Sequence, residues 1–533
     1  MTRSLRWIAA ALLMALSVAV VVGGAYRPTA QPAAVGLAAA AVAAALAALM
    51  IGLGVSRPWW GMLLFCAAMP IVNVARAQAW IGPIQIIPAT LVIAALVLGT
   101  VLNRAPNGQI AAPAGPARYP WLALAAGAAL AIAASLVTPW RGDAVNITLH
   151  GVLEPMAVFA VVVALRPRAE QALHALVAIA AGVTIATLIN FAWLVLLIGP
   201  RDLYFQRMLL ARLTYFSVGI FANMLVTAIP AAASVLFLRS RFRWSRAAVT
   251  GAAFAIGLMI VGLFFTYTKS AWLSAAVVAS LLIVLLVQGW RRRVPLLLGV
   301  AVLLALVVPY PLSTLRAVAP DLAVAYETFL VALQGEGRVE SWDPDTYQGS
   351  GSVGIRIEAL GAAAELAAGS PLFGVGPGGF QREFARIRPD ASVPELQSAH
   401  NLLPNLAAEY GLPLALLVAI GLAWTLIAAL RMRREPEIDR RVVGTALAVS
   451  LIGFLCMATL FGVDLYRTYR TMNTDVVTAA ALAAVAWSVA GGRRSPGERL
   501  PFEVASGDEG GEPVDQPAQL GAAGRDEIAI RRA

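Results

Sequence analysis

Charged residues, cysteine and histidine are all scarce in this 533-residue chain. Only 13% of the residues are charged and 60% are hydrophobic, whereas about a quarter of a soluble domain is charged. The composition therefore excludes an ordinary soluble protein and favours long membrane spans. The two cysteines, Cys66 and Cys456, lie in separate apolar segments, so neither a disulfide framework nor a metal site is indicated.

Other absences narrow the function classes. The chain has no Walker sequence and no nucleotide-sugar fingerprint, so neither a nucleotide nor another cofactor is expected. The glycine-rich stretch 374–379 is not a dinucleotide-binding loop, because Pro377 interrupts it and no strand precedes it. A tight, close-packed turn is the better interpretation. Few ionisable residues lie within the apolar runs, which argues against a proton pump or an ion channel.

The apolar runs predict an all-α polytopic membrane protein. A helix needs about 20 apolar residues to cross the hydrocarbon core, and the chain offers about 14 such runs, with 12 as a lower bound. The net charge of +11 is spread over the short loops between them, which excludes a nucleic-acid partner and indicates topology signals instead. The predicted spans are 7–25, 34–54, 59–74, 84–102, 120–139, 150–165, 171–199, 215–238, 247–267, 270–289, 295–312, 411–430, 442–462 and 473–490.

The arginine clusters predict the orientation. Placing the N-terminus in the cytoplasm puts the densest clusters, such as 291–293 and 431–441, on the same side, as the positive-inside bias requires. Both termini are then cytoplasmic, and the first apolar run is interpreted as a span rather than a signal peptide. The chain divides into N-terminal spans, spans with outward basic residues, a large extracytoplasmic loop, C-terminal spans and a disordered tail: 1–199, 200–312, 313–410, 411–490 and 491–533.

The large loop is expected to carry short amphipathic helices. Apolar residues recur at helical spacing from Ile355 through Ala359, Leu360 and Ala363 to Leu366, while Arg356 and Glu358 lie off that stripe. This pattern predicts a helix lying on the membrane surface or over the bundle.

His400 is the candidate catalytic residue. Pro404 is tolerated only in the first turn of a helix, so a helix should begin near Asn401, a good cap residue. The positive end of its dipole would favour neutral imidazole, which can accept a proton from a hydroxyl, and would attract phosphate. A polar residue that merely marks the membrane interface fits His400 equally well. For His150, at a span start, and for His174, a structural role is favoured.

Four basic residues lie in segments predicted to face outward, against the positive-inside bias: Arg207, Arg212, Lys269 and Arg356. Arginine presents a planar fork that matches phosphate geometry, whereas lysine is a point charge. Each of these residues alone is more often a contact for lipid headgroups. Together with His400 on one face of the membrane, they indicate an anionic, lipid-linked substrate.

These residues and the surrounding motifs resemble the O-antigen ligase and O-antigen polymerase family of membrane glycosyltransferases. The resemblance rests on Arg356, the Ser370–Phe380 stretch, His400-Asn401 with nine residues before Gly411, and Glu409. Weaker pieces are Arg212, Asn223 and Thr268 to Trp272, and the similarity covers roughly 200–462. The chain departs from the family where Lys269 replaces the usual arginine, where Asn223 lacks the Asn-Pro-Asn pattern, and at Leu414.

The resemblance implies transfer of a glycan from a polyprenyl-diphosphate carrier to an acceptor hydroxyl, at the outer face of the bacterial cytoplasmic (inner) membrane, without metal or cofactor. It implies that His400 deprotonates the acceptor and that Arg212 and Arg356 hold the diphosphate. Further substrate contacts would come from Lys269, Arg207, Asn401 and Glu409. Ligase, polymerase and protein oligosaccharyltransferase activities all stay open, and a small-solute or bicarbonate transporter is the alternative.

Overall fold

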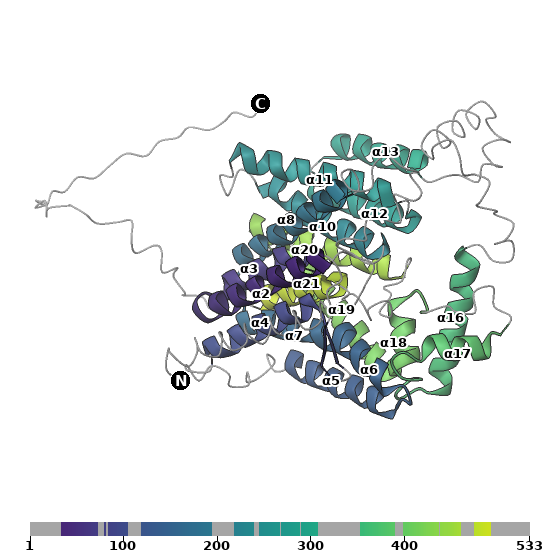
Figure 1. Cartoon of the computed structure of the whole chain (residues 1–533). Helices are drawn as coiled ribbons and strands as arrows, with labels where there is room; N and C mark the ends of the chain where they lie inside the picture. The colour runs from purple at the N-terminus through teal and green to yellow at the C-terminus, as the bar shows by residue number, and fades with distance from the viewer. Residues whose placement is uncertain are drawn as a thin grey trace, which may run out of the picture. The chain divides into compact units, whose positions relative to one another are not determined.

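The computed structural model describes residues 33–72, 79–81, 84–104, 119–193, 218–238, 245–266, 268–287, 289–307, 352–389, 398–435, 437–459 and 474–491, and these are almost entirely helical (Figure 1). The N-terminal helices are α2 (Ala33–Ser56), α3 (Pro58–Ala68), α4 (Pro88–Arg104), α5 (Tyr119–Val137), α6 (Arg141–Thr148), η4 (Leu149–Leu153), α7 (Glu154–Leu165) and α8 (Ala169–Trp193). The central helices are α10 (Val218–Leu238), α11 (Arg246–Thr266), α12 (Lys269–Leu286) and α13 (Trp290–Val307). The remaining helices are α16 (Ser352–Gly369), α17 (Phe380–Ile387), α18 (Leu402–Tyr410), α19 (Leu412–Met432), α20 (Ile438–Met457) and α21 (Thr474–Gly491).

One short hairpin interrupts the helical pattern. Strands β1 (Ala79–Ile81) and β2 (Ile84–Ile86) pair antiparallel, with Trp80 opposite Gln85. The sequence predicted a span from residue 84, but α4 begins only at Pro88. Proline at the start of a helix removes no backbone hydrogen bond, which explains why the helix begins there.

Within the described residues, seven helices are long and apolar enough to cross a membrane. They comprise α5, the continuous Arg141–Leu165 helix, and α8, α10, α11, α19 and α20, while the other apolar helices are shorter. Each predicted span within the described residues overlaps one of these apolar helices except 295–312, which overlaps α13, a helix that does not meet the same criteria of length and apolar composition. The chain is therefore a multi-pass membrane protein. The predicted span 7–25 and all of the predicted tail beyond Gly491 lie outside the described residues.

Helix α10 forms the centre of the bundle. It is buried along nearly its whole length and packs against α8, α11, α12 and α20. A helix that is apolar on all sides belongs inside a bundle rather than at its lipid-facing surface. Helices α11 and α19 contrast with it, because only 22% and 28% of their apolar windows are buried, as expected of helices that face lipid.

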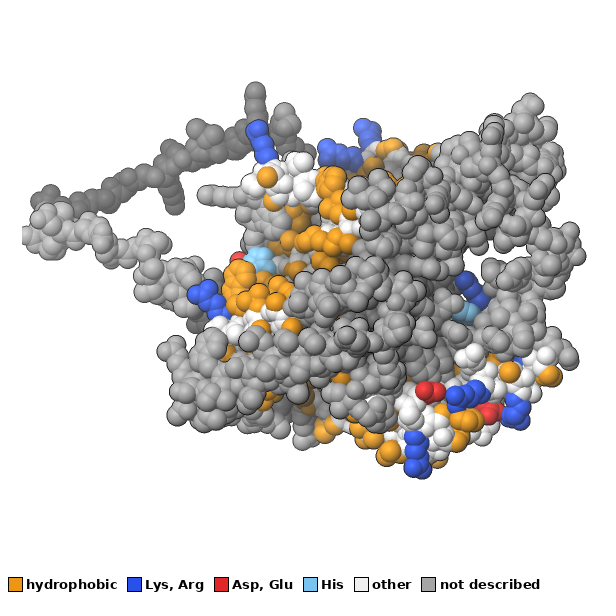
Figure 2. Space-filling model, viewed as in Figure 1, with side chains coloured by type: hydrophobic (Ala, Val, Ile, Leu, Met, Phe, Trp, Pro, Cys, Tyr) orange, Lys and Arg blue, Asp and Glu red, His pale blue; other side chains and the backbone are white. Residues whose placement is uncertain are grey.

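Helices α16, α17 and α18 pack together beside α5 and α6 (Figure 1). A helix forms where the sequence predicted one, as α16, and its buried stripe includes Ala359, Ala363 and Leu366. This stripe packs against Phe380 and Phe384 of α17, whose rings stack with centroids 5.7 Å apart. Basic side chains gather on the outer surface of this end of the molecule (Figure 2). Helix α16 thus packs mainly against α17 and α18, and whether it also lies on the membrane surface stays a prediction.

Candidate active site

His400 has a backbone conformation that residues other than glycine rarely adopt. Its φ is +49°, and Arg166 is the other non-glycine residue with positive φ in the described part of the chain. A left-handed conformation costs a residue with a Cβ roughly 1–2 kcal/mol. Strained residues persist only where the surrounding structure holds them, and they cluster at functional sites. The backbone of His400 is therefore held by its surroundings, and its catalytic role stays a prediction.

Helix α18 begins where the sequence predicted, but its start is not capped as expected. Asn401 is the N-cap residue with extended backbone, yet its side chain makes no capping hydrogen bond. Instead, Asn401 Nδ2 donates to the carbonyl of Thr459, 3.3 Å away at the end of α20. The prediction that this side chain caps α18 was wrong. Asn401 ties the residue after His400 to a span far along the chain.

Asn405, which the sequence analysis missed, holds the residue before His400. Its Oδ1 accepts a hydrogen bond of 3.1 Å from the backbone N–H of Ala399, and its Nδ2 lies 3.4 Å from Glu409 Oε2. The N–H of His400 itself donates to Ser398 Oγ at 3.3 Å. Asn405 is fully buried, whereas His400 is half-buried. The backbone is thus hydrogen-bonded at His400 and at both of its neighbours.

The glycine-rich turn packs tightly between α18 and the end of α5, as the sequence predicted. Val375 N–H donates to the carbonyl of Ala408 at 2.8 Å, which joins the turn to α18. Gly374 and Gly376 have φ of +63° and +89°, and a Cβ on Gly376 would collide with the side chain of Thr138. Only glycine fits both the conformation and the space.

Gly411 provides a sharp test of this packing. It links α18 to α19 with φ of +89° and ψ of 164°, and a Cβ there would collide with the backbone of Leu372. We expect Gly411→Ala to destabilise the protein by about 1–3 kcal/mol from backbone strain alone, and further through the collision. Gly421→Ala is the matched control, because Gly421 lies within α19 with open space around it. It should stabilise by up to about 1 kcal/mol. Thermal unfolding in detergent measures the melting temperature of each variant, and equal melting temperatures would contradict the tight packing at Gly411.

Glu409 and Tyr410 lie inside the protein rather than at its surface. Glu409 is fully buried, and Tyr410 is 1% exposed. The hydroxyl of Tyr410 lies 3.2 Å from Thr148 Oγ1, which in turn lies 2.6 Å from Ser135 Oγ. Burial, followed by the charge of Glu409, raises the pKa of Tyr410 well above its usual range, so the phenol stays neutral. This polar chain ties α18 to α6 and α5.

Arg356 lies on α16, one turn before the stripe that packs against Ala399. It is half-buried, and burial lowers the pKa of its guanidinium, although an arginine stays charged at any physiological pH. Lys269 is the first residue of α12. Arg207 and Arg212 lie outside the described residues. Their predicted convergence with His400 therefore stays a prediction.

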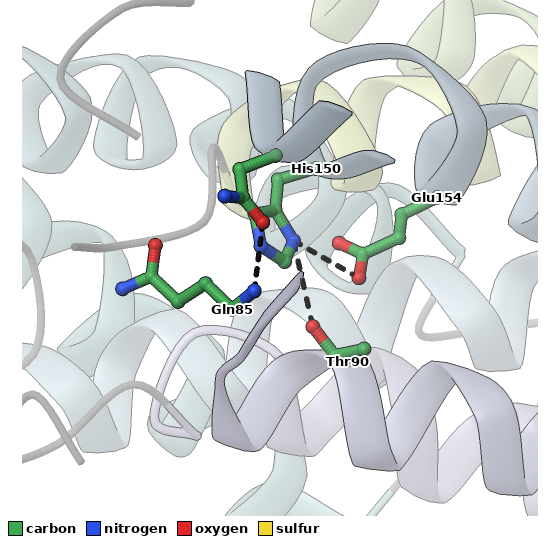
Figure 3. A network of polar contacts seen from close by, with 5 residues as sticks. Gln85, Thr90, His150 and Glu154 are labelled. Carbon is green, nitrogen blue, oxygen red and sulfur yellow. Dashed lines mark hydrogen bonds and ion pairs between the residues drawn. The ribbon is translucent and has the colours of Figure 1, made fainter. Parts of the chain in front are cut away.

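A second buried polar cluster surrounds His150 (Figure 3). His150 Nδ1 lies 3.1 Å from Glu154 Oε1 and 3.5 Å from Thr90 Oγ1, and the histidine and glutamate are both buried. The sequence placed His150 at the start of a span, but the helix begins at Arg141 and passes through His150. The polar residues of α6 hid this longer helix. His174, by contrast, is exposed on α8.

The backbone widens to a π-helical turn at His150. Element η4 (Leu149–Leu153) connects α6 to α7 without ending the helix. Such turns insert an extra residue into a helix and occur frequently at functional sites. Here the turn lies between Thr148, which contacts Tyr410, and Glu154, which contacts His150.

Residues 253–419 match the family model described as O-antigen ligase. The matched segment contains Lys269, Arg356, the glycine-rich turn, His400 and Glu409, and it ends within α19. This confirms the resemblance for that part of the chain, whereas Arg207 and Arg212 precede it. The comparison with curated proteins gave no match.

Proposed function

We propose that the protein is a membrane glycosyltransferase that moves a glycan from a polyprenyl-diphosphate carrier to an acceptor hydroxyl at the outer face of the bacterial cytoplasmic membrane. The observation that carries the proposal is the strained, hydrogen-bonded backbone of His400 inside the segment that matches O-antigen ligases. A half-buried imidazole at the start of a helix is suited to accept a proton in a site that is partly shielded from water.

The proposed reaction is a direct displacement. His400 takes the proton of the acceptor hydroxyl as its oxygen attacks the anomeric carbon. The glycosidic bond to the diphosphate breaks, and both electrons leave with the polyprenyl diphosphate. Negative charge grows on the diphosphate oxygens in the transition state, where a guanidinium fork stabilises it more than in the ground state. Arg356 and Arg212 are the proposed ligands, with Lys269, Arg207 and Asn401 as further contacts.

The direct test follows the donor. Purified protein in liposomes is supplied with a polyprenyl-diphosphate glycan and an acceptor, and release of the carrier and growth of the acceptor are measured together. Equal amounts of both products support the proposal. A carrier that stays glycosylated while small anions cross the liposome membrane would contradict it and favour the transporter alternative.

Arg356→Lys tests the diphosphate contact. Lysine keeps the positive charge but cannot bind two phosphate oxygens with a planar fork, so we expect transfer to fall by roughly 10- to 100-fold, the value of a charged hydrogen bond. Arg386→Lys on α17 is the matched control, because Arg386 is exposed and pairs with Glu383 of the same helix. It should leave the rate unchanged. Full activity of Arg356→Lys at limiting donor concentration would reassign Arg356 as a headgroup contact.

A further inference from the structure

We propose that Asn405 is a positioning residue that holds His400 in its left-handed conformation, and that Glu409 acts on His400 through Asn405 rather than on the substrate. The inference deepens the proposed function and rests on it. Both side chains are 0% exposed in the structure. A buried carboxylate or amide is costly unless it is hydrogen-bonded, so such groups are kept where their bonds fix a geometry.

The hydrogen bonds of Asn405 lead to the backbone beside His400. Asn405 Oδ1 accepts from the N–H of Ala399 at 3.1 Å, one residue before the left-handed position. That N–H precedes helix α18 and is removed from water, since Ala399 is 1% exposed. The side chain of Asn405 thus acts six residues back along the chain, and it supplies the partner that the hydrogen bonds of the helix do not reach.

Glu409 determines which way the Asn405 amide points. Its Oε2 lies 3.4 Å from Asn405 Nδ2, one helical turn further along α18. A carboxylate accepts and cannot donate, so the NH₂ group must face Glu409 and the carbonyl oxygen must face Ala399. Reversal of the amide would place its NH₂ group against the N–H of Ala399. The carboxylate therefore fixes the acceptor that holds the turn.

The turn at His400 determines where its imidazole lies. Because His400 has φ of +49°, a change in this turn reorients its Cα–Cβ bond and moves the ring nitrogen relative to a bound hydroxyl. A misplacement of about 1 Å costs on the order of 10²-fold in rate. Asn405 and Glu409 would therefore affect the rate of transfer without touching the substrate.

Exchanging the amide and the carboxylate between Asn405 and Glu409 tests this relay, in which Glu409 acts on His400 through Asn405. Asn405→Asp keeps an acceptor for Ala399 but places two carboxylates together, so activity should fall by about 10²-fold, mainly in kcat. In Asn405→Asp/Glu409→Gln the amide and the carboxylate trade places, which restores both hydrogen bonds and the charge. We expect the double variant to recover most of that loss. Glu409→Gln alone keeps an acceptor and should lose less than about tenfold.

A second readout does not depend on glycan transfer. The chain has three histidines, of which His150 is buried, His174 is exposed and His400 is half-buried. Diethylpyrocarbonate modifies accessible imidazoles, and mass spectrometry reports each site. Asn405→Asp should change the reaction rate of His400 but not of His174, and the double variant should return it to the wild-type rate. Ser450→Ala, which removes a buried hydrogen bond to Thr227, is the control and should change neither rate.

The transfer assay and the histidine-modification assay distinguish failure of the proposed function from failure of the relay. A wild-type protein without transferase activity defeats the proposed function, and the reactivity of His400 still decides the relay. Unchanged His400 reactivity in Asn405→Asp, or a double variant as impaired as Asn405→Asp, overturns the relay. A 10²-fold loss in Glu409→Gln with His400 reactivity unchanged also overturns it, because the charge of Glu409 would then act on the substrate.

Discussion

Replacing His400 by alanine is expected to lower the rate of glycan transfer by roughly 10²–10⁴-fold, the contribution of one positioned proton acceptor. The loss should fall on kcat, because the imidazole acts in the transition state while the diphosphate contacts still bind the donor. The rate of the wild-type enzyme should also decline as the pH is lowered and the imidazole becomes protonated. His174→Ala is the matched control, since His174 is exposed on α8, and it should leave transfer unchanged.

Two further variants separate the side chain of His400 from its backbone. Asparagine adopts left-handed φ more readily than most residues, so His400→Asn should keep the turn and still lose the activity. His400→Gly removes the strain of a Cβ at φ of +49°, so it should raise stability by about 1 kcal/mol and still lose the activity. A well-inserted His400→Ala protein with wild-type turnover would contradict the catalytic role and leave the interface marker as the explanation.

The sequence predicted the helices well because membrane spans are set by local composition. Runs of about 20 apolar residues need no knowledge of their neighbours. Predictions based on backbone demands also held locally: Pro404 placed the start of α18, and the glycine pattern indicated a tight turn at Gly374 and Gly376. Both features follow from steric rules that act within a few residues.

Side-chain partners could not be predicted in the same way. Asn401 is a favourable cap residue by type, yet its amide bonds to Thr459, and Tyr410 meets Thr148 from 262 residues away. Asn405 carried no local signal, because a polar residue in the first turns of a helix is common. The π-helical turn at His150 was not predicted either, since α6 contains polar residues that weaken the apolar pattern. Long-range packing determines each of these contacts.

The buried pair of His150 and Glu154 is expected to give the largest effect on stability. The two side chains are 0% and 4% exposed, with Nδ1 and Oε1 3.1 Å apart, inside a helix that is able to span the membrane. Removing one partner of a buried hydrogen-bonded pair leaves the polar atoms of the other desolvated without a partner, which costs about 1–3 kcal/mol, and more where that group is charged. We therefore expect His150→Leu to lower the free energy of unfolding by that amount at neutral pH.

The double variant His150→Leu/Glu154→Leu decides whether the pair or each residue separately is responsible. Replacing both groups by apolar side chains removes the orphaned carboxylate, so the double variant should be more stable than His150→Leu, with a coupling free energy of about 0.5–3 kcal/mol or more. Unfolding in detergent, followed by circular dichroism, measures all four proteins of the cycle. Additive losses would show that His150 and Glu154 contribute by packing alone.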